Sequence, residues 1–348
     1  MKKLYNTIDK RVLKERAKQE QEPRTTVSFY KYHPIEDPQS FRDTLFEEWE
    51  SLRVCGRTYI ANEGINAQIS VPTDLFDAFK TSLYAIPFLD GVRLNTAVEE
   101  AGNSFFKLSI KIRKKIVADG IDDPTFNPSN TGNHLSAQAF NAITDDPNTI
   151  LIDMRNHYES EVGHFENAIL PDADSFREEI ALLPDMLKGK EDHNIVMYCT
   201  GGIRCEKTSA FLKHIGFPNV HQLEGGIIKY ARDVKSAGLQ NKFKGVNFVF
   251  DERLAERISD DVIATCHQCG SPFDHHTNCA NLACHVLFIQ CDACKEKFNN
   301  CCCEECRDIA ALPEEEQRVL RKGKVAQRNV FRKGRGPRQI NTENAEGS

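Results

Sequence analysis

Hydrophobic and polar residues in the first third of the chain alternate with two different periods. Apolar side chains recur at every second position from Val27, again over Ile65–Val71 and again over Phe106–Arg113, which is the pattern of half-buried strands. A further strand, Arg57–Ala61, is separated from its successor by Asn62-Glu63-Gly64, which has the composition of a hairpin turn. In the two remaining intervals, after the first and after the third strand, apolar residues recur at the spacing of a helix. The order βαββαβ predicts a ferredoxin-like α+β domain with its helices on one face of the sheet.

The middle of the chain has a different hydrophobic pattern. Thr149–Met154 and Asn194–Tyr198 are short apolar runs of the kind found in buried parallel strands. Helical patterns separate them, over His134–Ile143 and Phe176–Leu187. This alternation predicts an α/β domain with a parallel sheet, whose ligands bind beyond the carboxyl ends of the strands. The residue just after the second run is Cys199.

The segments outside these two regions have little core-forming pattern. The beginning is rich in Lys, Arg, Glu and Gln, and the end combines a cysteine cluster with a polar tail. We therefore expect five segments: a charged helix over residues 1–24, the ferredoxin-like domain over 25–118, the α/β domain over 126–240, a cysteine-rich module over 241–312, and a basic, partly disordered tail over 313–348.

The overall composition is that of a water-soluble globular protein. The 348 residues include 45 Lys and Arg against 51 Asp and Glu, a net charge of −6, and 40% are hydrophobic. No stretch approaches the roughly 18 uninterrupted apolar residues that a membrane helix needs, and the beginning has no apolar segment typical of a signal peptide. These features predict a cytoplasmic protein without a membrane partner, while the oligomeric state stays open.

The segment around Cys199 carries the strongest candidate chemistry. A buried strand ends there, two glycines allow a tight loop, and a helix follows. Inward-facing backbone N–H groups, the helix N-terminus and Arg204 would each stabilise a thiolate and lower the cysteine pKa. An inert buried cysteine is the alternative, and the glycines and Arg204 argue against it. Cys205 is a possible second thiol, with packing as an equal alternative. The remaining loop residues, which would form an anion cradle, are Thr200, Gly201, Gly202 and Ile203.

The C-terminal cysteines indicate metal binding. Only three of the 13 cysteines precede position 266, and in a reducing compartment such a density favours metal ligation over disulfides. Pairs separated by two residues direct two thiolates to one ion, and four sulfurs complete a tetrahedral zinc shell. Zinc is favoured over iron–sulfur because no C-x2-C-x2-C run exists. We expect one or two structural zinc ions, with ligands drawn from Cys266, Cys269, Cys291 and Cys294 for one ion and from Cys279, Cys284, Cys303 and Cys306 for another. In a single site, some thiolates would be replaced by His267, His275, His276 or His285.

Basic residues are concentrated in two places. Between Gln317 and Ile340 there is no acidic residue, and such a stretch on an acidic protein favours a polyanion, most simply nucleic-acid phosphates. A tail that only improves solubility is the alternative. A second basic surface follows one predicted strand. The candidate RNA-binding residues are Lys107, Lys111 and Arg113 on that strand, and Arg318, Arg321, Lys322, Arg328, Arg332 and Lys333 in the tail.

The cysteine loop resembles the active-site loop of rhodanese domains, which carry sulfur as a cysteine persulfide. Residues 151–155 (LIDMR) and 161–169 (EVGHFENAI) resemble two further motifs of that family, and the resemblance covers residues 130–240. It implies that Cys199 is the nucleophile, and that Asp153, Arg155 and His164 stabilise the domain. Related phosphatases have one more residue between Cys and Arg, so the shorter spacing here disfavours a phosphatase.

The whole chain resembles the bacterial rhodanese-domain tRNA uridine hydroxylases. Matching stretches include residues 56–67 (GRTYIANEGINA), 248–253 (FVFDER) and 266–269 (CHQC). The resemblance implies oxygen-dependent conversion of wobble uridine to 5-hydroxyuridine, with tRNA as partner and molecular oxygen as co-substrate. The sequence contains no flavin, haem or non-haem iron signature. One hypothesis is that the Cys199 thiolate adds to C6 of uracil. A persulfide-carrying sulfurtransferase is the alternative enzyme, and a non-enzymatic RNA-binding scaffold is a third possibility.

Overall fold

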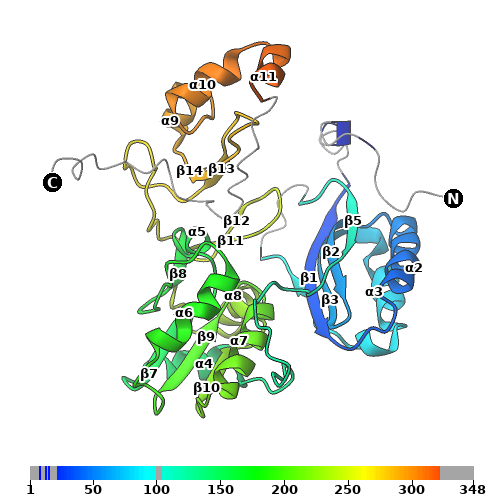
Figure 1. Ribbon diagram of the computed structural model, residues 1–348, viewed down its shortest axis with the longest axis vertical. Helices are drawn as coiled ribbons and strands as arrows, with labels where there is room; N and C mark the ends of the chain where they lie inside the picture. Colours follow the sequence, from blue (N-terminus) through cyan, green and yellow to red (C-terminus); the bar gives the residue numbers. More distant parts are fainter. Residues whose placement is uncertain (1–7, 9–11, 14, 16–21, 99–103, 322–348) are drawn as a thin grey trace.

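The computed structural model describes residues 8, 12, 13, 15, 22–98 and 104–321. Figure 1 shows an N-terminal domain in blue and cyan, an α/β domain in green, and a C-terminal part in yellow and orange. The predicted α+β and α/β classes are both confirmed. No helix in the described part of the chain has the length and apolar character needed to cross a membrane.

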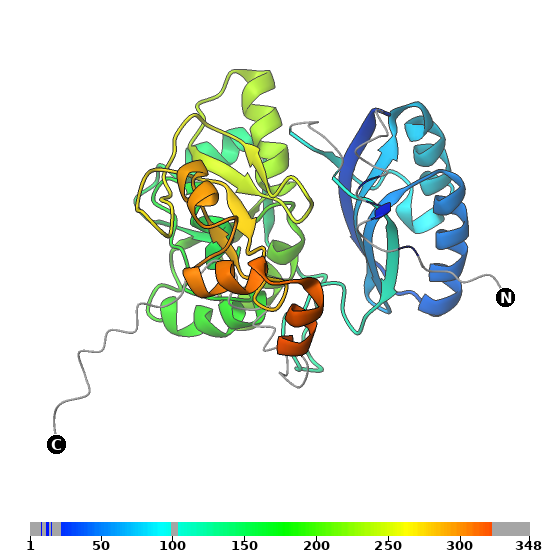
Figure 2. The same cartoon turned by 90° about the horizontal axis from the view of Figure 1, so that it is seen from above.

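The N-terminal domain is a single sheet covered by two helices. Its strand order is β4-β1-β3-β2-β5, and β2 and β3 form an antiparallel hairpin closed by Asn62 and Glu63. Both helices lie on the face of the sheet that points away from the α/β domain (Figure 2). The elements are β1 (Arg24–Tyr32), α2 (Pro38–Ser51), β2 (Cys55–Ala61), β3 (Gly64–Pro72), α3 (Phe76–Tyr84), β4 (Asn95–Thr96) and β5 (Leu108–Ile112), with short 3₁₀ turns at Thr73–Leu75 and Pro87–Leu89.

One strand of this domain was not anticipated from the sequence. The fourth strand of the ferredoxin-like motif is β4, which pairs with β1 and contains only two residues. The expected fourth strand, β5, lies instead at the opposite edge, where it pairs in parallel with β2. A two-residue strand is too short to show a hydrophobic period, so the pattern assigns the fourth strand to the alternating run at Leu108–Ile112 instead.

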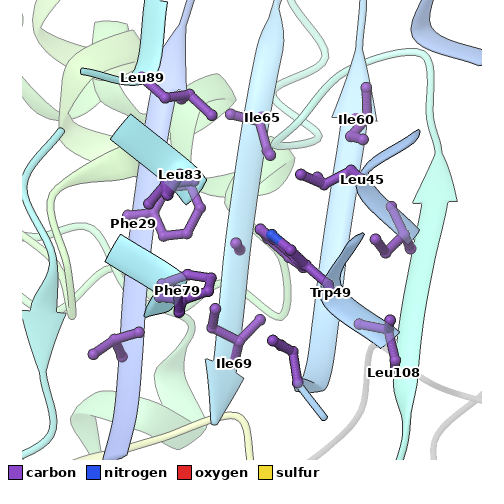
Figure 3. Close-up of a cluster of buried hydrophobic side chains, with 14 of the residues drawn as sticks. Phe29, Leu45, Trp49, Ile60, Ile65, Ile69, Phe79, Leu83, Leu89 and Leu108 are labelled. Atoms are coloured by element: carbon purple, nitrogen blue, oxygen red, sulfur yellow. The ribbon is translucent and has the colours of Figure 1, made fainter. Parts of the chain in front are cut away.

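The core of the N-terminal domain follows the predicted alternation. Trp49 of α2 is fully buried between the sheet and Phe79 of α3, and Phe29 of β1 meets its ring edge-to-face at a centroid distance of 6.3 Å. Figure 3 shows these rings together with Ile65 and Ile69 of β3. Because every second residue of β3 is in this core, the residues between them point to the opposite face of the sheet.

The α/β domain has a four-stranded parallel sheet in the order β6-β10-β9-β7. Its first helix starts later than predicted, because residues 133–135 form a strand too short to show a period of its own. The elements are β6 (Asn133–Leu135), α4 (Ala137–Ile143), β7 (Thr149–Asp153), α5 (His157–Ser160), β8 (Gly163–Phe165), α6 (Phe176–Met186), β9 (Asn194–Tyr198), α7 (Ile203–His214), β10 (Val220–Leu223) and α8 (Gly226–Ala237).

The C-terminal part begins inside a sheet that it shares with the α/β domain. Strand β11 pairs antiparallel with β8, and Gly163 lies opposite Gly245. A Cβ atom at Gly163 would lie 2.2 Å from the Val246 carbonyl oxygen, so the two strands approach too closely for a side chain there. The segments before and after residue 240 therefore pack against each other through this shared sheet. The elements are β11 (Phe243–Phe248), β12 (Ala255–Arg257), β13 (His276–Asn278), β14 (Leu287–Ile289), α9 (Asp292–Lys297), α10 (Glu304–Ala311) and α11 (Glu314–Arg321).

Candidate active site

Cys199 lies directly after β9 and before α7, at the carboxyl edge of the parallel sheet. The loop turns back on itself at Gly202, which has a φ of +99° and forms the N-cap of α7. The backbone N–H of Gly202 donates to the Cys199 sulfur over 3.1 Å. Gly202 is needed here because side-chain-bearing residues rarely adopt this φ. The loop thus cradles the sulfur in the way expected of an anion site.

The Cys199 thiol is acidic for a buried cysteine. Burial raises the pKa of this thiol. A hydrogen bond from the Cys205 thiol, the charge of Arg204 and the backbone N–H groups of Arg204 and Cys205 together lower it by more, so that the resulting pKa is about 6. At neutral pH the sulfur is therefore a thiolate. Burial and the neighbouring Cys199 raise the pKa of Cys205 well above its usual value, so Cys205 stays protonated and acts as the donor.

Arg204 is held by a residue that the sequence did not single out. Its guanidinium forms a two-pronged ion pair with Glu159 of α5, at 2.7 and 2.8 Å, and also lies 3.5 Å from the Thr200 hydroxyl. Glu159 is fully buried, and Arg204 is 7% exposed. Because the pairing fixes both groups, the positive charge stays beside Cys199. A capping box with Asn156 positions Glu159, and that motif is the signal that could have identified it.

The N-terminal sheet covers the cysteine loop. Tyr32 donates from its hydroxyl to the carbonyl of Ile203 over 3.4 Å, and the Asn95 amide donates to the carbonyl of Gly201 over the same distance. A Cβ atom at Gly202 would lie 2.9 Å from the Tyr30 hydroxyl. The loop glycines are therefore needed for this close approach as well as for the turn.

A cavity of about 530 Å³ lies between the two domains and reaches Cys199. This volume falls within the range of roughly 300–1,000 Å³ that small-molecule sites occupy. One wall is the cysteine loop, and the other is the polar face of the N-terminal sheet. Sequence analysis did not identify this second wall, although polar residues alternate with the apolar core positions. The sheet residues that line the cavity include Ser28, Tyr30, Tyr59, Asn66, Gln68 and Asn95.

The predicted basic strand lines this cavity and a second one. Arg113 lies at the first cavity, with its guanidinium 5.3 Å from the centre of the Tyr59 ring. Lys107 and Lys111 line a neighbouring cavity of about 610 Å³. Arg57 and Phe250 border both cavities, so the two are adjacent.

The predicted basic tail is only partly described. Arg318 lies on α11 and pairs with Glu314 at 3.1 Å, and Arg321 is the last residue of that helix. The other tail residues, Lys322, Arg328, Arg332 and Lys333, lie outside the described residues, as do those expected to be disordered.

The first expected cysteine quartet is brought together. The sulfur atoms of Cys266, Cys269, Cys291 and Cys294 all lie within 4.8 Å of one another, and those of Cys269 and Cys291 are 3.5 Å apart. Four thiolates around zinc stand roughly 3.8 Å apart, so this donor set fits a tetrahedral ion. The backbone N–H of Cys291 donates to the Cys266 sulfur over 3.3 Å, as is usual for bound thiolates.

The second quartet differs from the expected one in one member. The sulfurs that cluster are those of Cys279, Cys284, Cys302 and Cys306, so Cys302 takes the place assigned to Cys303. The Cys302 sulfur lies 3.7 Å from both Cys284 and Cys306. The spacing rule failed because Cys303 is an extended N-cap of α10, where consecutive side chains point to opposite sides.

The candidate histidines take other positions. His267 lies 2.7 Å from Glu161, His275 pairs with Asp274, and His276 is buried beside Phe248. Among the described residues, no histidine belongs to either quartet. This includes His285, the fourth candidate histidine.

Comparisons with known proteins follow this architecture. Residues 24–116 match the UPF0176 acylphosphatase-like domain, residues 136–233 the rhodanese-like domain, and residues 244–307 the C-terminal rhodanese domain. A tRNA uridine(34) hydroxylase of Pectobacterium atrosepticum is 58% identical over 96% of this chain and 94% of its own length. One from Yersinia pestis is 57% identical with the same coverage. At this identity over nearly the whole length, the chain belongs to the tRNA uridine(34) hydroxylase family.

Proposed function

We propose that this protein hydroxylates the wobble uridine of tRNA to 5-hydroxyuridine, with molecular oxygen as co-substrate and Cys199 as the reacting residue. The observation that carries the proposal is the Cys199 thiolate at the wall of an interdomain cavity large enough for a nucleoside. The names of the relatives supply the substrate and the position of the modified base. The reducing cytoplasm, where tRNA is found, is the compartment that suits a chain with thirteen cysteines, most of them in a metal-ligand pattern.

The reaction needs C5 of uracil to become electron-rich. The thiolate forms a bond to C6, and the electron pair of the C5=C6 bond moves onto C5 and O4. Carbon C5 then bonds to one oxygen atom of O₂, and loss of the C5 proton and of the thiolate restores the double bond. The second oxygen atom leaves as water, and the two electrons and two protons for this step come from two thiol groups that join as a disulfide. Cys205, hydrogen-bonded to Cys199, is one such thiol within the site.

The residues around the cavities suit an unpaired stretch of RNA. Proteins bind such RNA by stacking bases on aromatic or guanidinium planes and by pairing phosphates with basic side chains. Tyr59 with Arg113 offers a stacking surface beside Cys199. Lys107 and Lys111 would contact phosphates of flanking nucleotides in the adjacent cavity. Arg318, Arg321 and the tail beyond them would add sequence-independent affinity for the body of the tRNA.

The cysteine quartets would each hold one structural zinc ion. Four thiolates close the coordination shell, which leaves no open position for substrate. Bound zinc would join β13, β14, α9 and α10 into one folded unit and supply no redox chemistry.

A sulfurtransferase is the second candidate, because the same loop can hold a persulfide on Cys199. Nucleoside mass spectrometry of tRNA from cells with and without the gene distinguishes the two activities. Loss of 5-hydroxyuridine, restored by the wild type and not by Cys199→Ala, supports hydroxylation. Unchanged 5-hydroxyuridine together with thiosulfate:cyanide transfer by the purified protein would establish the sulfurtransferase instead.

A further inference from the structure

We propose that Asn66 reads the hydrogen-bonding edge of the target base and makes the site select uracil over cytosine. The inference rests on the proposed function, and assigns base recognition to the N-terminal sheet, which faces the cysteine loop across the cavity. Asn66 lies in β3 on the face opposite the core, between the buried residues Ile65 and Ala67. Its half-buried side chain lines the same cavity as Cys199.

The amide of Asn66 cannot rotate freely, because one of its hydrogens is already committed. Its Nδ2 donates to the backbone carbonyl of Ile116 over 3.2 Å. A carbonyl oxygen only accepts hydrogen bonds, so the oxygen of the amide cannot take the place of the nitrogen. The backbone at Ile116 is itself held, since the Ile116 N–H donates to Glu63 Oε1 over 2.6 Å and Glu63 pairs with the buried Lys207 at 2.8 Å.

A fixed amide distinguishes the two pyrimidines. Uracil presents a donor at N3–H and an acceptor at O4, which match the Oδ1 acceptor and the remaining Nδ2 hydrogen of Asn66. Cytosine presents an acceptor at N3 and a donor at its N4 amino group. The same amide orientation would then place acceptor against acceptor and donor against donor, which leaves both pairs of groups unsatisfied.

Gln68 provides an internal comparison. It lies two residues along the same strand, on the same face and at the same cavity. Among the described residues it makes no hydrogen bond that would orient its amide, so it can turn to suit either base. We therefore expect Gln68 to contribute affinity and Asn66 to contribute selectivity.

The test measures binding in the full-length Cys199→Ala protein, which cannot turn over its substrate. Two transcripts of one tRNA, differing only by uridine or cytidine at position 34, are titrated in a fluorescence anisotropy assay. A two-bond match to a base edge discriminates by roughly 5- to 100-fold, so this protein should prefer the uridine transcript by a factor in that range. Adding Asn66→Ala should bring the ratio close to one. Adding Gln68→Ala should weaken both complexes and keep the ratio. Circular dichroism of the variants checks that each is folded.

The outcomes separate this inference from the proposed function. A ratio that survives Asn66→Ala would overturn the role of Asn66 and leave the proposed substrate intact. Equal binding of both transcripts by Cys199→Ala itself would also overturn the inference, and the proposed function would then be decided by the tRNA nucleoside analysis. Asn66→Ala with active Cys199 should additionally raise KM for the uridine substrate while small-molecule alkylation of Cys199 stays unchanged.

Discussion

Lys207 of α7 and Glu63 of the β2–β3 turn form an ion pair of 2.8 Å that joins the α/β domain to the N-terminal domain. The Lys207 side chain is only 2% exposed and also contacts Asp119 in the segment between the two domains. The Lys207 charge is therefore buried. A buried charge that loses its partner lowers the stability of the folded protein. This contact therefore helps to hold the N-terminal sheet over Cys199, together with the hydrogen bonds of Tyr32 and Asn95 to the cysteine loop.

Neutralising Glu63 should loosen the domain interface. In Glu63→Gln, Lys207 keeps Asp119 as a counter-charge, so the protein should still fold, with its free energy of unfolding lowered by roughly 1–3 kcal/mol. The midpoint temperature of thermal unfolding and the kcat/KM for tRNA should both decrease. Glu36→Gln, an exposed position in the same domain, is the matched control and should leave both unchanged. Identical behaviour of the two variants would contradict the proposed role of the pair.

The reactivity of Cys199 should follow a thiolate with a pKa of about 6. Iodoacetamide alkylation should increase as pH rises through this value and level off above it, because only the thiolate reacts. Mass spectrometry identifies the modified residue, and Cys199→Ser provides the background. Removing the nearby charge without leaving a buried partner, in Arg204→Met/Glu159→Leu, should move the midpoint upward. A midpoint near that of free cysteine in the wild type would refute the activation of this thiol.

Addition of Cys199 to C6 of uracil should be trapped with tRNA that contains 5-fluorouridine, because fluorine at C5 cannot leave as a proton does. We expect a covalent protein–tRNA complex that survives denaturing electrophoresis and is absent for Cys199→Ser. Cys205→Ser, which retains the attacking sulfur, should still form the complex. An active wild-type enzyme that gives no adduct would rule out this covalent step.

The metal content should distinguish two adjacent cysteines. If each quartet binds one zinc ion, Cys302→Ser should lower the zinc content of the purified protein from two equivalents toward one, and should lower its thermal stability. Cys303→Ser should retain both ions, because Cys303 lies outside the quartet. Elemental analysis of the two proteins, purified in parallel, gives the comparison. Loss of zinc from Cys303→Ser alone would restore the ligand set that the spacing suggested.

The two basic regions should differ in how they affect RNA binding. Replacing Lys107 and Lys111 by alanine should weaken tRNA binding and also slow modification, since both residues lie beside the site. Removing residues 322–348 should weaken binding and flatten its salt dependence, because fewer counterions are released. Cys199 alkylation is the control and should be unaffected in both. Equal affinity and an equal salt slope for full-length and shortened protein would assign the tail to solubility alone.

Sequence patterns predicted those parts of the molecule that depend on local periodicity. The alternation of Ile65, Ala67 and Ile69 identified a strand and its buried face, and the glycines after Cys199 identified the loop. Short elements could not be predicted, because β4 and β6 contain only two and three residues, too few to show a period. Contacts between distant parts of the chain could not be predicted either, such as those of Glu159 with Arg204 and of Asn66 with Ile116. Neither pair has a spacing rule, since tertiary packing alone brings its members together.

The pairing of β8 with β11 has a consequence for where the chain can be divided. The interlocked glycines at Gly163 and Gly245 make residues on either side of position 240 parts of one sheet, so a break there would leave an open strand edge and an exposed apolar surface. A fragment that ended near residue 240 would therefore expose the edge of β8 to other chains. The α/β domain and the cysteine-rich part therefore share one folding unit, in which β11 closes a sheet that begins at β8.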